Sequence, residues 1–106
     1  MPTFQVARSL AETWVHLMTE GSAELVKDLT LSRPYGWVFF YQSRAYLQNP
    51  SDIASALAGN APILVEKVNG ELRVLGTAHP VEWYLYQYEK ELPPARLQMK
   101  TELPQW

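Results

Sequence analysis

The N-terminal segment carries hydrophobic side chains at the spacing of an amphipathic helix. They recur at i, i+3, i+4 and i+7, and they are Ala7, Leu10, Ala11, Trp14, Leu17 and Met18. Thr3 is placed to act as the N-cap, and Gly21 suits the left-handed residue that follows a helix. We therefore predict one helix that packs this apolar stripe on a flat surface.

The pattern then changes to a two-residue period, which predicts strands. In residues 25–32, leucines alternate with polar side chains, as in a strand with one buried face. The sequence Arg33-Pro34-Tyr35-Gly36 predicts a turn, because proline in the second position and glycine in the fourth favour one. Residues 37–41 are apolar throughout. This predicts a central strand that is covered on both faces, or one that presents a face to a partner.

Residues 44–60 predict two short helices. Arg44–Leu47 has the composition of a helical turn that ends before Asn49-Pro50. Ser51-Asp52 is placed to cap a second short helix, which would run through Leu57 and end at Gly59.

Two strand-like runs flank Asn69-Gly70, the preferred pair for a two-residue hairpin turn. This turn would place Val65 opposite Val74 and Glu66 opposite Arg73. The core face of the hairpin would then hold Ile63, Val65, Leu72 and Val74. The other face would carry Glu66 and Arg73 as a cross-strand charge pair in contact with water.

The C-terminal part predicts a second main helix and a final strand. Pro80 suits the first position of a helix, and Pro93-Pro94 ends it. Its buried stripe would be Val81, Tyr84, Leu85, Tyr88 and Leu92. Residues 95–103 alternate again, which predicts an edge strand.

The predicted element order is α-β-β-(α)-β-β-α-β, and the fold class is α+β. The length of 106 residues suits one domain that spans the whole chain, 1–106. We expect a mainly antiparallel sheet of four to five strands, with the two main helices packed on one face.

Composition and charge exclude several classes of function. The chain has no cysteine, so disulfides, thiol nucleophiles and thiolate metal sites are absent. Its net charge is −2, with the two signs interspersed, and no basic stripe is available for a nucleic acid. No apolar run is long enough to cross a membrane, and the N-terminus lacks a signal pattern. We expect a cytoplasmic protein without nucleic-acid or membrane partners.

The sequence offers no catalytic or cofactor site. The two histidines, His16 and His79, are not at metal-ligand spacing with an acid. No serine lies in a nucleophile elbow, and the glycines do not form a phosphate loop. We predict that the protein is not an enzyme and binds no metal or cofactor. His79 is expected to cap the last helix, while catalysis by His79 stays open as a third reading.

Three blocks of the sequence resemble a known family. They are Tyr35-Gly36-Trp37-Val38-Phe39-Phe40-Tyr41-Gln42-Ser43-Arg44, Leu57-Ala58-Gly59-Asn60-Ala61-Pro62, and Leu75-Gly76-Thr77-Ala78-His79-Pro80-Val81-Glu82 with Leu85 and Tyr88-Glu89. Together they resemble the YrhB-like group, the immunity protein 35 domain, over about residues 25–90. The stretch Gln48–Ser55 is longer than the usual connection of the family, and residues 93–106 form a C-terminal extension outside the resemblance.

The resemblance implies a small α+β protein of a bacterial polymorphic toxin system. Such a protein would neutralise a cognate toxin by occluding it, without chemistry of its own, and several toxins of these systems carry peptidase-type domains. The alternative is a homodimeric chaperone-like or housekeeping binding protein, in which the 95–106 tail and the aromatic strand pair with a second copy.

Two groups of aromatic side chains are candidates for partner binding. On the last helix, Trp83 and Tyr86 lie off the buried stripe, on the same side as Glu82 and Glu89. Rings set among acids are common at interface hot spots. On the apolar strand, Trp37, Phe39 and Tyr41 would form a contact surface if their face of the sheet is bare. His79 completes the candidate set. The helix carboxylates, including Glu91, would suit a partner with a basic surface.

Overall fold

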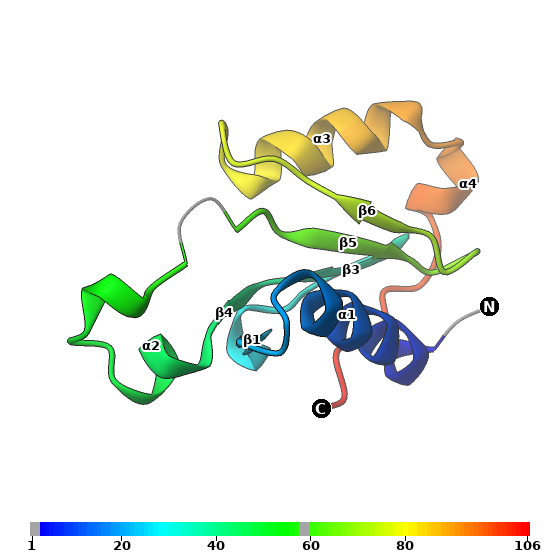
Figure 1. Ribbon diagram of the computed structural model, residues 1–106. Helices are drawn as coiled ribbons and strands as arrows, with labels where there is room; N and C mark the ends of the chain where they lie inside the picture. The colour runs from blue at the N-terminus through cyan, green and yellow to red at the C-terminus, as the bar shows by residue number, and fades with distance from the viewer. Residues whose placement is uncertain (1–2, 58–59) are drawn as a thin grey trace.

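A computed structural model describes residues 3–57 and 60–106 (Figure 1). The amphipathic N-terminal segment forms α1 (Phe4–Met18), and the Thr3 side chain accepts a hydrogen bond from the Val6 N–H, as expected of an N-cap. The buried stripe of α1 is Phe4, Ala7, Ala11 and Val15.

The stripe predicted for α1 is therefore partly wrong. Leu10, Leu17 and Met18 are exposed, while Phe4 and Val15 are buried. The buried side of the helix is turned relative to the predicted stripe. Phe4 fills the core at one end, and the small side chains of Ala7 and Ala11 let the helix approach the sheet closely.

The single strand predicted for 25–32 is two strands in different sheets. β1 (Ala23–Leu25) pairs with β4 (Tyr41–Ser43), and β2 (Leu31–Arg33) pairs with β3 (Gly36–Phe39). The 3₁₀ turn η1 (Lys27–Leu29) takes the chain from one sheet to the other and leaves Leu29 exposed. The alternation of leucines does not reveal this step, because three residues of 3₁₀ turn interrupt it only briefly.

The main sheet has the order β2-β3-β5-β6 and is antiparallel throughout, with β5 (Ile63–Glu66) and β6 (Leu72–Val74) as its other half. The predicted turn at residues 33–36 is confirmed, since Arg33 pairs with Gly36. Gly36 is required there: a Cβ at this position would lie 2.2 Å from the backbone oxygen of Val65 on β5.

The second hairpin forms, but its register differs from the prediction by two residues. Val65 lies opposite Leu72, and Leu64 lies opposite Arg73. The loop spans residues 67–70, and only Gly70 in it has a positive φ, of 70°. A two-residue type I′ turn would need positive φ at both Asn69 and Gly70. The longer loop avoids that requirement for Asn69.

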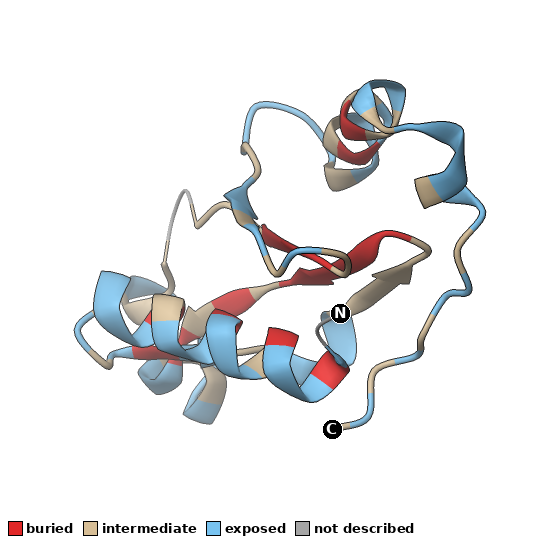
Figure 2. Cartoon of the chain, turned by 90° about the vertical axis from the view of Figure 1, so that its right-hand side faces the viewer, coloured by how far each residue is buried: buried red, intermediate tan, exposed pale blue. Residues whose placement is uncertain are grey.

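The helices and antiparallel strands confirm the α+β class. The predicted packing of both main helices on one face is wrong, because α1 and α3 lie on opposite faces of the sheet (Figure 1). Alternate side chains of β3 and β5 explain why. Trp37, Phe39, Ile63 and Val65 pack with α1. Val38 and Leu64 pack with Leu85 and Tyr88 of α3 (Val81–Glu91). Figure 2 shows that buried residues concentrate on the central strands between the helices. Strands that are apolar on both faces need a cover on each.

The connection after β4 contains α2 (Arg44–Gln48), which confirms the first short helix predicted there. The second is reduced to the 3₁₀ turn η2 (Ile53–Ser55). Its predicted stop at Gly59 lies outside the described residues.

The C-terminal segment does not form the predicted edge strand. Pro94 instead starts the short helix α4 (Pro94–Leu97), and residues 98–106 have no regular structure. Backbone carbonyl oxygens of the tail accept hydrogen bonds from side chains of the domain. The Lys67 ammonium donates to the carbonyl of Lys100 and the Trp37 indole N–H donates to the carbonyl of Glu102, both at 2.7 Å. The tail thus packs on its own chain.

Candidate functional site: the outer face of helix α3

Helix α3 presents three distinct sides. Its buried stripe centres on Leu85 and Tyr88, as predicted, and the helix begins at Val81 with Pro80 as the capping residue. One flank faces β2 and carries Glu82 and Glu89. The remaining side, away from the sheet, carries the exposed aromatic rings.

The flank toward β2 is fixed by charge-assisted contacts. Glu82 forms an ion pair with Arg33 of β2, with Oε1 and Nη2 2.6 Å apart. The hydroxyl of Tyr35, in the β2–β3 turn, donates to Glu89 at 2.7 Å. Burial raises the pKa of the Tyr35 phenol above its ordinary value, and the hydrogen bond to the Glu89 carboxylate raises this pKa further. Both contacts join α3 to the β2–β3 hairpin.

A buried carboxylate lies beneath the C-terminal half of α3. Glu66 of β5 is only 1% exposed, and it accepts a hydrogen bond from the Tyr88 hydroxyl. Its other oxygen lies 2.9 Å from Nη1 of Arg96 in α4, as an ion pair without hydrogen-bond alignment. Burial raises the pKa of the Tyr88 phenol above its ordinary value, and the hydrogen bond to the Glu66 carboxylate raises this pKa further.

The sequence prediction of a water-facing Glu66–Arg73 pair is therefore wrong. With the observed register, Leu64 is opposite Arg73, and the side of β5 that carries Leu64 and Glu66 is covered by α3. A signal existed in the sequence: Ile63-Leu64-Val65 is an uninterrupted apolar run, which is typical of a strand covered on both faces.

The outer side of α3 exposes two large rings. Trp83 is 43% exposed and Tyr86 is 59% exposed. His79 stacks on Trp83 with ring centroids 4.0 Å apart, and Lys90 lies 4.4 Å from the centroid of the Tyr86 ring. The predicted capping role of His79 is not observed, because α3 has no side-chain cap; instead the Tyr84 hydroxyl accepts the His79 backbone N–H.

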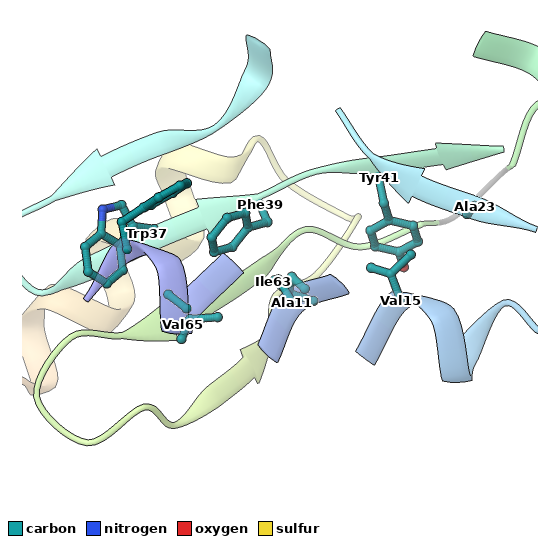
Figure 3. Packing of buried hydrophobic residues seen from close by; sticks show 10 residues of the cluster. Ala11, Val15, Ala23, Trp37, Phe39, Tyr41, Ile63 and Val65 are labelled. Atoms are coloured by element: carbon teal, nitrogen blue, oxygen red, sulfur yellow. The ribbon is translucent and has the colours of Figure 1, made fainter. Parts of the chain in front are cut away.

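The second candidate group, Trp37, Phe39 and Tyr41, is not a surface. Trp37 and Phe39 are completely buried, and Tyr41 is 9% exposed. Figure 3 shows these three side chains among the buried residues that include Ala11 and Val15 of α1. The C-terminal Trp106 also contacts this cluster, with its ring centroid 6.2 Å from that of Phe39. The helix and the tail therefore cover the sheet face on which this group lies.

The sequence-predicted residues thus divide by location. His79, Trp83 and Tyr86 lie together on the outer side of α3, with Glu82 and Glu89 on the adjoining flank. Among residues 3–57 and 60–106, no three His, Asp or Glu side chains form a group that could hold a metal ion. Exposed aromatic rings beside charged side chains are a combination that is common where one macromolecule binds another.

Within the described parts of the chain, no helix has both the length and the apolar character that a membrane span requires.

Comparisons with known proteins identify relatives. The family model of immunity protein 35 matches residues 5–90, which extends the resemblance seen in the sequence to include α1. "Uncharacterized protein YrhB" of Escherichia coli (strain K12) is 39% identical over 74 residues, a stretch that covers 70% of this chain and 78% of that protein. No solved structure matches. The tail after Leu92 lies outside the matched part. This chain belongs to the immunity protein 35 family.

Proposed function

We propose that this protein is an immunity protein that binds a cognate bacterial toxin through the outer face of α3 and neutralises it by occlusion. The observation that carries the proposal is the exposure of Trp83 and Tyr86, one turn apart on a helix whose opposite side is buried against the sheet. Membership of the immunity protein 35 family supplies the class of partner.

Aromatic rings lose little conformational entropy when they bind a partner. A tryptophan or tyrosine ring has few rotatable bonds, so it buries a large area against a partner while losing little entropy. Contacts with His79 and Lys90 already restrict Trp83 and Tyr86 in the free protein. Such preorganisation increases affinity, because less freedom remains to be lost in the complex.

The protein would act without chemistry of its own. In this proposal it meets the toxin in the cytoplasm, and the toxin is inhibited because α3 blocks its active region. A peptidase-type toxin is the finer form of this hypothesis. Glu82 borders the rings, its side chain is 68% exposed, and it would face basic groups of the toxin.

The experiment uses the protein encoded beside the gene for this chain. That neighbour should arrest growth when it is expressed alone, and co-expression of this chain should restore growth. The two purified proteins should form a complex on size exclusion. A neighbour that is harmless, or a toxin that neither binds this chain nor is neutralised by it, would contradict the proposal.

A further inference from the structure

Strand β6 is one of the two edge strands of the main sheet, and a groove of about 660 Å³ lies between it and helix α3. Strand β6 forms one wall of this groove, and Arg73 is its residue on the α3 side of the sheet. The flank of α3 opposite to Glu82 forms the other wall, through Tyr84, Gln87 and Glu91. This groove is separate from the outer rings Trp83 and Tyr86.

The hydrogen bonds of β6 show which backbone groups face the open edge. The Glu66 N–H donates to Glu71, and the Leu75 N–H donates to Pro62, both at 2.9 Å. In an antiparallel ladder, hydrogen-bonded pairs alternate with pairs that are not bonded. Leu72 and Val74 therefore direct their N–H and C=O groups away from β5, toward the free edge.

The β6 edge lacks two of the residue types that block pairing with another strand. Residues 71–75 contain no proline and no lysine, the residues that commonly block such edges. Val74 is 53% exposed on the face of the sheet that α1 covers. An added strand would therefore find two donors and two acceptors, a half-exposed valine on one face and the α3 groove on the other.

The groove is held in its shape by Tyr84. Its hydroxyl accepts hydrogen bonds from the backbone N–H groups of Ala78 and His79, at 2.9 and 3.2 Å. Gly76 leaves the space for this ring, since a Cβ there would lie 2.3 Å from the Tyr84 oxygen. The loop that joins β6 to α3 is thus attached to the helix, and the two walls are kept at a fixed separation.

The charges of the groove favour a basic occupant. Glu71 and Arg73 form an ion pair at 3.0 Å, so their charges cancel. Glu91 also lines the groove, and no cation of the described residues lies within ion-pair distance of it. It sits in the last turn of α3, where the helix dipole is negative and adds to its field. The groove therefore carries a net negative charge.

We infer that β6 receives an extended segment of the toxin as an additional antiparallel or parallel strand, with a lysine or arginine side chain of that segment directed into the groove toward Glu91. This inference rests on the proposed function. A second copy paired symmetrically about Arg73, the middle residue of β6, would place two arginines directly opposite each other, which disfavours that register.

The first test is hydrogen exchange on the wild-type protein, free and in complex with the toxin encoded beside its gene. The amides of Leu72 and Val74 should exchange about tenfold more slowly, or slower still, in the complex than in the free protein. Unchanged exchange at both amides in a formed complex would overturn the inference while leaving the proposed function intact. Protection that appears without toxin as protein concentration rises would also overturn it, in favour of a second copy.

The second test compares two substitutions at Val74. Val74→Pro removes an outward N–H and no bond to β5, whereas Val74→Thr keeps this N–H and a β-branched side chain. Val74→Pro should weaken toxin binding about tenfold or more relative to Val74→Thr. Equal affinities of two folded variants would overturn the inference. If Val74→Pro does not fold, the exchange measurement decides.

The third test addresses charge. Glu91→Gln should weaken toxin binding several-fold and reduce its dependence on salt. Asp52→Asn, at an exposed site in the 44–60 connection, is the matched control and should leave both unchanged. Equal salt dependence of the Glu91→Gln and wild-type complexes would overturn the basic side chain in the groove. Absence of any binding by the wild-type protein would instead contradict the proposed function itself.

Discussion

The two faces of the main sheet are built in different ways. On the α1 side, Trp37, Phe39 and their neighbours form a closed apolar cluster. On the α3 side, the apolar cluster is smaller, and carboxylates complete it: Glu66 meets Tyr88 and Arg96, while Glu89 meets Tyr35. The first face stabilises the fold through burial. The second orients a helix whose outer side stays exposed, so binding and stability are assigned to different faces.

The largest effect on stability should come from the α1 side. Phe39 is completely buried and contacts both Phe4 and Trp106. Phe39→Ala should lower the free energy of unfolding by roughly 3–5 kcal/mol, because it leaves a cavity among rigid rings. Urea denaturation measures this change. A loss below about 1 kcal/mol would show that the cluster is not the main source of stability.

The buried ion pair on the α3 side should rank next. Arg96→Met leaves Glu66 buried without its cation and should cost about 3 kcal/mol, the lower end of the usual range because the Arg96 side chain is 26% exposed. The double variant Glu66→Leu/Arg96→Met removes both charges and should recover part of this loss. Equal stability of the single and double variants, by thermal denaturation, would contradict the role assigned to the pair.

The buried phenols should make stability sensitive to alkaline pH. The pKa values of Tyr35 and Tyr88 are raised above the ordinary value of 10.0 in the folded state, chiefly by burial. Their contribution is therefore complete below pH 10.0, and it declines above this pH because the unfolded chain ionises first. Tyr35→Phe should lower the free energy of unfolding by about 1 kcal/mol at neutral pH, and it should reduce the decline in stability above pH 10.0.

Denaturant midpoints measured across the alkaline range check this prediction. Tyr86→Phe is the control, since Tyr86 is 59% exposed. This variant should show the same dependence of the denaturant midpoint on pH as the wild-type protein. An alkaline decline in Tyr35→Phe as steep as that of the wild-type protein would contradict the assignment.

The smallest effect on stability should come from the outer rings. Trp83→Ala and Tyr86→Ala remove side chains that are 43% and 59% exposed, and each should change the free energy of unfolding by less than about 1 kcal/mol. A small change in the free energy of unfolding is expected because these rings lie on the outer side of α3 and not in the core. A loss as large as that of Phe39→Ala would mean that the rings belong to the core.

Several elements could be predicted from local sequence. The helix that begins after Thr3, the turn at residues 33–36 and the stripe of α3 around Leu85 all follow from periodicity and from capping or turn residues. The exposure of Trp83 and Tyr86 follows from the same periodicity, because both lie off that stripe.

Other features depend on contacts between distant parts of the chain. The burial of Glu66 follows from a two-residue change of register and from Arg96, which lies thirty positions further along. Apolar and polar residues alternate in the tail as in a strand, yet its backbone carbonyl oxygens accept hydrogen bonds from side chains such as Lys67 and Trp37. Tertiary contacts of this kind override local pattern, and one sequence alone does not display them.

Titration calorimetry of two double variants against the toxin encoded beside the gene tests the central claim most directly. Trp83→Ala/Tyr86→Ala removes the rings of α3, while Leu17→Ala/Met18→Ala removes exposed apolar side chains of α1, which are 69% and 64% exposed. We predict that the α3 variant stays folded and binds at least about a hundredfold more weakly than the wild-type protein, and that the α1 variant binds normally. Wild-type affinity of the α3 variant would contradict the account.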